Sequence, residues 1–377
     1  MNGTRPGMDR VSPNAFSNRI AAWDGLAVIT RFDRPTGSWM LIALHDDTLG
    51  RPTGGTRMRV YADPADALED AQRLAEGMTH KWAAVGLPYG GGKAVIAPPR
   101  PLESEERHGL LERYGRLLAS LGGVFATGED LGTTPDDMAL IARHTRYVMG
   151  KPGGEPEDPG PYTSRGVFHG ILATLAHLDG STGQPPGDGP PRLSGESVLI
   201  QGLGDVGTPL ARQLSDAGAR LLLCDLDAAR AEALAAELDA EVVAPNRVFA
   251  TPCDVFAPCA VGAVINRETI PLLRCRAVAG SANNQLAEPE DADRLHRRGI
   301  LYAPDYLING GGALAFGLME LHPGADDDEI FSRVEALGDS LIEVFDEAAE
   351  RAESPLATTH RRVEEVLAGR RPLADYG

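Results

Sequence analysis

Ser197-Val-Leu-Ile-Gln-Gly-Leu-Gly-Asp-Val-Gly-Thr-Pro-Leu210 joins an apolar, strand-like run to a Gly-x-Gly-x-x-Gly pattern and the start of an amphipathic helix. A second apolar run follows this helix and ends at Asp225. Gly202, Gly204 and Gly207 would allow a pyrophosphate to sit on the amino end of the helix, while Asp225 could hold both ribose hydroxyls. The glycines alone are weak evidence, but the strand, helix and acid in this order predict a dinucleotide-binding unit.

The acid at the end of the second strand also bears on the choice of cofactor. Asp225 would repel a 2′-phosphate, and it is followed by Leu226 and Asp227 rather than by an arginine. Adenine dinucleotides with a free 2′-hydroxyl are accepted by such an acid, so the sequence favours NAD over NADP.

Further apolar runs, at 240–243, 255–258, 277–281 and 300–304, alternate with helical stretches. This alternation predicts the remaining strands of a doubly wound parallel sheet, whose carboxyl ends face a ligand crevice. Polar residues gather where that crevice is expected, in Ser281-Ala-Asn-Asn284-Gln and in Asn309-Gly-Gly-Gly312.

A second signal lies in the stretch Met78-Thr-His-Lys-Trp-Ala-Ala-Val-Gly-Leu-Pro-Tyr-Gly-Gly-Gly-Lys93. It is not a phosphate loop, because Leu87 and Ala94 stand where that pattern needs glycine and Ser or Thr. Lys81 and Lys93 lie among apolar residues, and a desolvated lysine near another cation has a lowered pKa. Because a catalytic base needs a neutral amine, we favour a functional role over a surface loop.

The rest of the amino-terminal half contains simpler patterns. Apolar runs at 27–32 and 39–44 predict a hairpin, and a helix is expected from Asp63 to Gly77. The paired glycines of Thr53-Gly-Gly-Thr-Arg-Met could offer backbone N–H groups to an anion. Asp130 follows a strand-like run, and taken by itself it is best explained as a helix-capping carboxylate.

Size and charge restrict the class of protein. A chain of 377 residues suits two domains, no apolar run is long enough to span a membrane, and the polar residues 1–18 predict a loose tail. The net charge of -18 argues against nucleic acid or an anionic membrane as partner. The four cysteines form no CxxC pair and no metal-like group with histidine, which favours reduced thiols in a cytoplasmic protein without a metal.

Several motifs occur in one order along the chain: Thr53-Gly-Gly-Thr-Arg-Met, the two-lysine stretch, Gly128-Glu-Asp-Leu-Gly-Thr-Thr, Gly202-Leu-Gly-Asp-Val-Gly, Phe256-Ala-Pro-Cys-Ala, Gly280-Ser-Ala-Asn-Asn-Gln-Leu, Tyr302-Ala-Pro-Asp-Tyr and Asn309-Gly-Gly-Gly. Together they closely resemble the leucine/phenylalanine/valine dehydrogenases of the glutamate dehydrogenase superfamily. The resemblance covers about residues 25–370 and includes the two-lysine stretch and Asp130.

The resemblance implies an α/β protein with two domains and a cleft that closes to exclude water. An α/β substrate-binding and catalytic domain at 19–160 would also mediate homo-oligomer formation. A doubly wound Rossmann NAD-binding domain would occupy 161–325, and the C-terminal helices at 326–377 would pack back towards the cleft.

The chemistry implied by the resemblance is the NAD-dependent, reversible oxidative deamination of an L-amino acid to a 2-oxo acid and ammonia. Lys81 would bind the substrate carboxylate with help from Asn284 and the backbone of Gly54 and Gly55. Lys93 would be the general base that activates water, and Asp130 would exchange protons with the amino group. The candidate cofactor-binding residues are Thr163, which would hold the nicotinamide carboxamide, and Gly202, Gly204, Asp205, Val206, Gly207, Asp225, Ala260 and Asn284.

The side-chain pocket of the family maps onto Thr53, Gly128, Ala313 and Phe316. Gly128 and Ala313 open space and Phe316 offers an aromatic wall, so we expect a bulky, aromatic substrate such as phenylalanine. Differences of one methylene in an apolar pocket are worth only about 1–3 kcal/mol, so overlap with leucine is expected. No lysine lies near this pocket to bind a side-chain carboxylate, which argues against glutamate.

Three residues depart from the family pattern, namely Trp82 after the first lysine, Asp205 inside the glycine loop and Arg165 close to Thr163. Two other readings remain open: a branched-chain or tryptophan dehydrogenase with the same chemistry, and a non-catalytic NAD-binding paralogue that serves as a scaffold or sensor. The second would be expected to have lost one of Lys81, Lys93 and Asp130. A hydroxy-acid dehydrogenase is disfavoured, because the nine histidines are scattered without a matching context.

Overall fold

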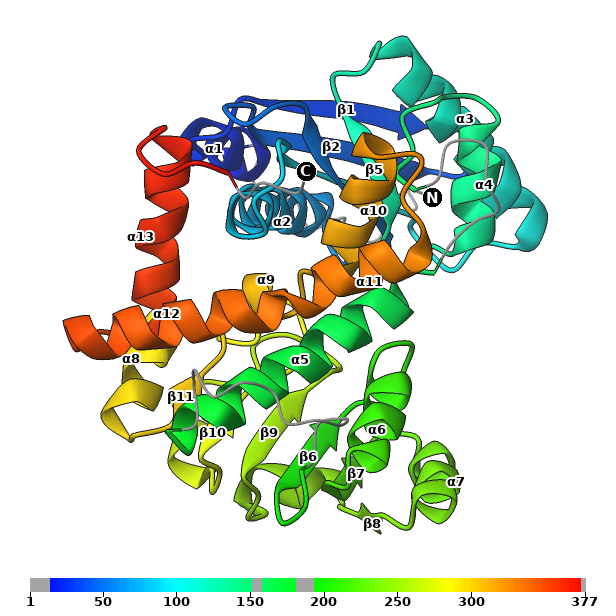
Figure 1. Ribbon diagram of the computed structural model, residues 1–377. Helices are drawn as coiled ribbons and strands as arrows, with labels where there is room; N and C mark the ends of the chain where they lie inside the picture. The colour runs from blue at the N-terminus through cyan, green and yellow to red at the C-terminus, as the bar shows by residue number, and fades with distance from the viewer. Residues whose placement is uncertain (1–13, 151–157, 181–192, 374–377) are drawn as a thin grey trace. The chain divides into compact units, whose positions relative to one another are not determined.

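The computed structural model describes residues 14–150, 158–180 and 193–373. Contacts divide the chain into unit 1, Met1–Thr79 with Pro88–Met149, and unit 2, His80–Leu87 with Gly150–Gly377 (Figure 1). Most of the predicted tail lies outside the described residues, and its last residues begin helix α1.

Unit 1 is built on a five-stranded sheet with the order β1-β2-β4-β3-β5. The predicted hairpin is confirmed, because β1 and β2 pair antiparallel from Ala27–Leu44 to Asp33–Ser38. β2 is antiparallel to β4, whereas β3 is parallel to both β4 and β5. The elements are α1 (Asn14–Ala22), β1 (Ala27–Asp33), β2 (Ser38–Asp46), β3 (Pro52–Met58), α2 (Pro64–Ala84), β4 (Gly90–Ala97), α3 (Ser104–Ser120), β5 (Ala126–Glu129) and α4 (Pro135–Ala142).

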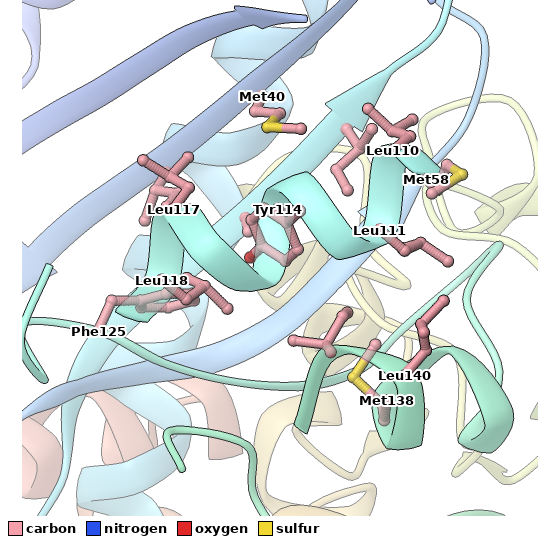
Figure 2. Packing of buried hydrophobic residues seen from close by; sticks show 14 of the residues in the cluster. Met40, Met58, Leu110, Leu111, Tyr114, Leu117, Leu118, Phe125, Met138 and Leu140 are labelled. Atoms are coloured by element: carbon pink, nitrogen blue, oxygen red, sulfur yellow. The ribbon is translucent and has the colours of Figure 1, made fainter. Parts of the chain in front are cut away.

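Both faces of this sheet are buried, which explains the continuous apolar runs in its central strands. Along β2, Met40, Ile42 and Leu44 face one core while Leu41 and Ala43 face the other. Figure 2 shows the first core, in which α3 side chains pack against the sheet and against α4. Each leucine fully buried in this way stabilises the fold by roughly 1.5–3 kcal/mol.

Helix α2 is longer than the sequence predicts. Instead of ending near Gly77 it continues to Ala84, so that Lys81 lies on a helix. The apolar face goes on past Gly77 through the buried Trp82 and Ala83, and this packing outweighs the cost of about 1 kcal/mol for a glycine inside a helix. Gly86, with φ of 74°, ends the helix in the left-handed conformation that glycine adopts readily.

The glycines before Lys93 form the start of strand β4, and they are required by packing. A Cβ on Gly91 would lie 1.9 Å from Oγ1 of Thr79, and one on Gly92 would lie 2.8 Å from the Phe125 ring. These glycines therefore allow a close approach of the strand to the protein's own atoms. As a result β4 lies directly against its neighbours, and Lys93 projects from a completely buried strand.

Unit 2 contains a six-stranded sheet with the order β11-β10-β9-β6-β7-β8, in which all neighbouring strands are parallel (Figure 1). This confirms the predicted doubly wound sheet, and the direction of strand addition reverses between β6 and β9, where such sheets bind ligands. The strands are β6 (Ser197–Gln201), β7 (Arg220–Cys224), β8 (Glu241–Val242), β9 (Val255–Pro258), β10 (Ala277–Val278) and β11 (Leu301–Tyr302).

The helices of unit 2 are α5 (Gly160–Leu178), α6 (Gly207–Asp216), α7 (Ala228–Leu238), α8 (Glu290–Arg297), α9 (Asp305–Ile308), α10 (Gly311–Leu321), α11 (Asp327–Glu335), α12 (Leu337–Arg351) and α13 (Pro355–Leu367), with short 3-10 turns at Pro245–Ala250 and Ile270–Leu272. The C-terminal helices α11 to α13 belong to unit 2. Among the described residues, no helix is both long and apolar enough to cross a membrane.

Candidate active site

Lys93, Asp130 and Arg57 meet on the sheet of unit 1. Lys93 is part of β4, Arg57 of the neighbouring β3, and Asp130 directly follows β5 on the other side of β3. Nζ of Lys93 lies 3.2 Å from Oδ2 of Asp130, and Nε of Arg57 donates to the same oxygen at 2.9 Å. All three side chains are largely buried, with exposed fractions of 7%, 13% and 11% for Lys93, Asp130 and Arg57.

The structure argues against a helix-capping role for Asp130. Helix α4 is capped by Thr134, whose hydroxyl accepts from the backbone N–H of Asp137 while the Asp137 carboxylate accepts from the N–H of Thr134. The Asp130 carboxylate pairs with the two cations instead, so capping does not explain it.

Burial and charge act in opposite directions on the two members of the pair. Burial lowers the pKa of Lys93 and the positive charge of Arg57 adds to this, while the Asp130 carboxylate opposes it. For Asp130, burial disfavours the anion, but the charges of Lys93 and Arg57 and the Arg57 hydrogen bond together lower its pKa to about 2. Asp130 is thus an anion at any working pH, beside an amine that gives up its proton more readily than an ordinary lysine.

Behind Arg57 lies a second carboxylate. Nη1 of Arg57 donates to Oδ2 of Asp70 at 3.0 Å, and the Tyr61 hydroxyl donates to the same oxygen at 2.5 Å. Arg73 also donates to Asp70, at 3.1 Å. Arg57 is a site residue that the sequence motifs do not predict. The alternation of side chains along β3 places Arg57 on the same face as Gly55, but only the structure shows that this face meets Asp130, where a Cβ on Gly55 would lie 2.8 Å from Cβ of Asp130.

In unit 2, Lys81 is joined to the loop that follows β10. Its Nζ donates to Oδ1 of Asn283 at 3.2 Å, and Nδ2 of Asn309 donates to the same oxygen at 2.9 Å. The family resemblance predicts Asn284 as the partner of Lys81 on the substrate carboxylate. In the structure the Lys81 ammonium donates to the side chain of Asn283.

Asn284 is instead held through its backbone. It has a φ of 50°, a conformation that residues other than glycine adopt uncommonly, and its N–H donates to the carboxylate of the half-buried Asp305. Burial raises the pKa of Asp305, an effect that the nearby Lys81 charge and this N–H oppose. Strained residues of this kind gather at ligand sites, which keeps Asn284 a candidate.

The glycine loop of unit 2 fits a dinucleotide. Gly202 has a φ of 99°, which favours glycine, and a Cβ on Gly207 would lie 1.9 Å from the carbonyl oxygen of Gly202. Around a Cβ on Gly204 there is no described heavy atom within 4 Å, so a pyrophosphate has room to approach the backbone there. The three glycines thus have three different roles: turn, ligand approach and helix packing.

Asp225 lies at the end of β7, where the ribose of such a dinucleotide is bound. Its carboxylate accepts from the N–H of Leu203 at 2.7 Å and from the N–H of Asp227 at 2.8 Å. Burial disfavours its charge, but these backbone hydrogen bonds and Arg230 lower the pKa of Asp225. Arg230, on α7, approaches it to 3.6 Å, so an arginine is present near the ribose site although none directly follows Asp225 in sequence.

The other predicted cofactor-binding residues surround this loop. A Cβ on Gly202 would lie 2.6 Å from that of Ala260, while Val206 precedes α6 and Asp205 is exposed. Thr163 lies on α5, and its hydroxyl donates to the carbonyl of Pro159 at 2.9 Å. Its oxygen keeps lone pairs that can accept from an amide.

The predicted side-chain pocket residues are divided between the units. Thr53 on β3 and Gly128 on β5 belong to unit 1, where these strands are neighbours. Ala313 and the buried Phe316 lie one turn apart on α10 in unit 2. Gly54 and Gly55 lie on β3 between two stretches that pair with β4, at Pro52–Thr53 and at Thr56–Met58.

Two departures from the family pattern have a structural explanation. Arg165 forms an ion pair with Glu335 of α11, with Nε 2.7 Å from Oε1, and so joins α5 to α11. Trp82 is 2% exposed and contributes to the core that extends α2. Among the described residues, no group of histidines, cysteines and carboxylates could hold a metal ion.

These features are typical of an NAD-dependent dehydrogenase: a parallel sheet with a dinucleotide-binding loop, and a buried lysine–carboxylate pair. The chain belongs to the Glu/Leu/Phe/Val dehydrogenase family: the dimerisation domain of that family matches residues 38–147, and its Glutamate/Leucine/Phenylalanine/Valine dehydrogenase domain matches residues 222–359. The protein is an oxidoreductase, an amino-acid dehydrogenase that uses NAD. The predicted family, fold class and cofactor are confirmed.

Relatives with different substrates in their names resemble the chain about equally. Leucine dehydrogenase of Geobacillus stearothermophilus is 40% identical, over 83% of this chain and 82% of its own length. L-tryptophan dehydrogenase of Nostoc punctiforme is 41% identical, over 82% and 84%, and a crystal structure of such an enzyme from that organism matches with a TM-score of 0.75, 35% identity, and 94% and 99% coverage. Phenylalanine dehydrogenase of Lysinibacillus sphaericus is 38% identical, over 89% and 87%.

Proposed function

We propose that this amino-acid dehydrogenase acts on a bulky L-amino acid, with phenylalanine preferred, and converts it reversibly to the 2-oxo acid and ammonia. The observation that carries the chemistry is the buried pair of Lys93 and Asp130, in which Lys93 has a lowered pKa and Asp130 stays ionised. A base with these properties is what water attack on an iminium requires.

In the proposed mechanism Lys81 binds the substrate carboxylate, supported by Asn284 and the backbone of Gly54 and Gly55. Asn283 orients the Lys81 ammonium through its side-chain oxygen. Asp130 exchanges a proton with the substrate amine. Bound NAD supplies the hydride acceptor for the substrate Cα.

After the hydride has left the substrate, neutral Lys93 removes a proton from a water molecule as the water attacks the iminium carbon. Asp130 stabilises the resulting Lys93 ammonium and accepts or returns protons as ammonia leaves. The glycine loop at 202–207, Asp225, Thr163 and Ala260 hold the dinucleotide and exclude water around it.

We propose the domain division of the sequence analysis for these roles, with substrate chemistry at 19–160 and NAD binding at 161–325. We also propose a cytoplasmic homo-oligomer. The match to a dimerisation domain at 38–147 and the unpaired state of Cys224, Cys253, Cys259 and Cys275 support this proposal.

An absorbance assay of NADH formation at alkaline pH with NAD and each of the twenty L-amino acids tests the substrate. Phenylalanine well ahead of leucine and valine is the expected ranking. Leucine, valine or tryptophan in the lead would keep the mechanism and reject the specificity. No reduction with any amino acid, despite measurable NAD binding, would support a non-catalytic NAD-binding protein.

Phe316 is expected to shape the side-chain pocket. Phe316→Val should change the ranking of kcat/KM between phenylalanine and leucine by about 10-fold or more, because a pocket difference of this size is worth about 1–3 kcal/mol. Phe168→Val is the matched control, since Phe168 is similarly buried, on α5, and is not assigned to the pocket. An unchanged ranking in Phe316→Val would show that the pocket is mapped wrongly.

Asp225 is expected to set the preference for NAD over NADP. In Asp225→Ser the repulsion of a 2′-phosphate is lost while Arg230 remains close by, so the ratio of kcat/KM for NAD to that for NADP should fall at least 10-fold. In the double variant Asp225→Ser/Arg230→Ala, most of the increase in kcat/KM for NADP should be lost. If the ratio for Asp225→Ser matches that of the wild type, Asp225 does not read the ribose.

A further inference from the structure

We propose that Arg57 is a positioning residue for this reaction: it holds the Asp130 carboxylate in place beside Lys93, while Asp70 and Tyr61 fix the guanidinium. The inference rests on the proposed function, because it concerns the residue that acts there as base. It adds a third charged group to the pair of Lys93 and Asp130.

The geometry identifies Arg57 as a bridge between two carboxylates. One edge of its guanidinium reaches Oδ2 of Asp130 at 2.9 Å, and Nη1 reaches Oδ2 of Asp70 at 3.0 Å. The planar fork of an arginine can satisfy two fixed acceptors at once, whereas the compact ammonium of a lysine cannot reproduce both directions. Because Asp70 is itself held by Tyr61, the guanidinium has little freedom to follow Asp130 if Asp130 moves.

Arg57 is linked to the proposed base, Lys93, through one oxygen of Asp130. Lys93 and Arg57 both contact Oδ2 of Asp130, so each competes with the other for the same negative charge. By itself the Asp130 carboxylate favours the ammonium form of Lys93 and opposes the effect of burial. Arg57 weakens that pair from the carboxylate side and repels the Lys93 ammonium directly, and among the charges around Lys93 it is the one that lowers the pKa of Lys93 further.

Asp70 has a different task. It neutralises Arg57 in a largely buried position, with 12% of the Asp70 side chain exposed. Without Asp70, the Arg57 guanidinium and the Lys93 ammonium would share Asp130 as their one anion. Two cations on one carboxylate are costly in a buried site. Asp70 therefore makes the close approach of Arg57 to Lys93 tolerable, although its own negative charge acts on Lys93 more weakly and in the opposite direction.

The test measures the protonation of Lys93 directly as well as the activity. The chain has only three lysines, Lys81, Lys93 and Lys151, so competitive acetylation with acetic anhydride across pH, followed by peptide mass spectrometry, reports each lysine separately. The variant is Arg57→Met/Asp70→Asn, which removes both charges and leaves no unpaired buried carboxylate at position 70.

In Arg57→Met/Asp70→Asn the acetylation midpoint of Lys93 should rise by about one pH unit, and the acid limb of the kcat/KM profile should move upward with it. Arg57→Lys keeps the charge and loses the fork, so its Lys93 midpoint should stay near that of the wild type while kcat falls. The matched control is Arg113→Met/Asp33→Asn, which removes another arginine–carboxylate pair of unit 1, joined at 2.6 Å, and should leave the Lys93 midpoint in place.

An unchanged Lys93 midpoint in Arg57→Met/Asp70→Asn overturns the inference, whatever happens to the activity. An equal rise in the Arg113→Met/Asp33→Asn control also overturns it, because the effect would then be general. If the midpoint rises but the acid limb of kcat/KM does not move, Arg57 controls Lys93 as proposed and the role of Lys93 as base fails. The two proposals can therefore fail separately.

Discussion

Lys93→Ala is expected to lower kcat/KM by about 10²–10⁴-fold, the range that a positioned general base contributes. NAD binding should change little, because the glycine loop and Asp225 are built entirely from unit 2 and Lys93 belongs to unit 1. Initial rates with phenylalanine give kcat/KM, and a titration of tryptophan fluorescence with NAD gives the affinity.

The wild type should also show the pH dependence of a lysine base. The neutral amine is the active form, so kcat/KM rises with pH through the lowered pKa of Lys93 and levels off above it. Arg113→Met/Asp33→Asn serves again as control, with unchanged pH dependence. If Lys93→Ala retained more than a tenth of the wild-type kcat/KM, another group would have to be the base.

Features that depend on neighbouring residues in the chain could be predicted from the sequence. Gly202, Gly204 and Gly207 act within one strand–turn–helix segment, so their spacing alone indicates the dinucleotide loop. The alternation of strands and helices likewise predicts a doubly wound parallel sheet, whereas the strand order comes from the structure. Lys93 and Asp130 are named as site residues by the family resemblance, and the structure adds that they lie 3.2 Å apart.

Features that depend on contacts between distant segments could not be predicted. The Arg57 bridge joins a strand to Asp70 on α2 and to Asp130 after β5, and none of these segments carries a local pattern that identifies the others. The glycines of β4 show that a local pattern can also mislead. Their pattern is typical of a ligand-binding loop, but glycine is required there because Thr79 and Phe125 pack against the strand. A missing Cβ has the same appearance in a sequence whether a ligand or a neighbouring element occupies the space.

Asp130→Asn is expected to affect catalysis, pH dependence and stability together. Loss of the proton-exchanging carboxylate should lower kcat by about 10²-fold or more. The Lys93 ammonium loses the anion that stabilises it while Arg57 remains, so the pKa of Lys93 falls further and the acid limb of kcat/KM moves to lower pH. This direction is opposite to that expected for Arg57→Met/Asp70→Asn, although both variants disturb the same three side chains.

The free energy of unfolding of Asp130→Asn should be lower by about 3–5 kcal/mol, because two largely buried cations lose their shared partner. Urea denaturation at neutral pH measures this loss, and Asp33→Asn, which leaves only the more exposed Arg113 without its partner, should lose less stability and keep the wild-type pH profile. The wild type gains the Asp130 contribution only where the carboxylate is ionised, so it is complete above the ordinary pKa of 3.8 and is lost as the pH falls towards about 2. The difference in stability between wild type and Asp130→Asn should therefore shrink across that interval. A constant difference, or an acid limb that moves upward in Asp130→Asn, would show that Asp130 is not the anion shared by Lys93 and Arg57.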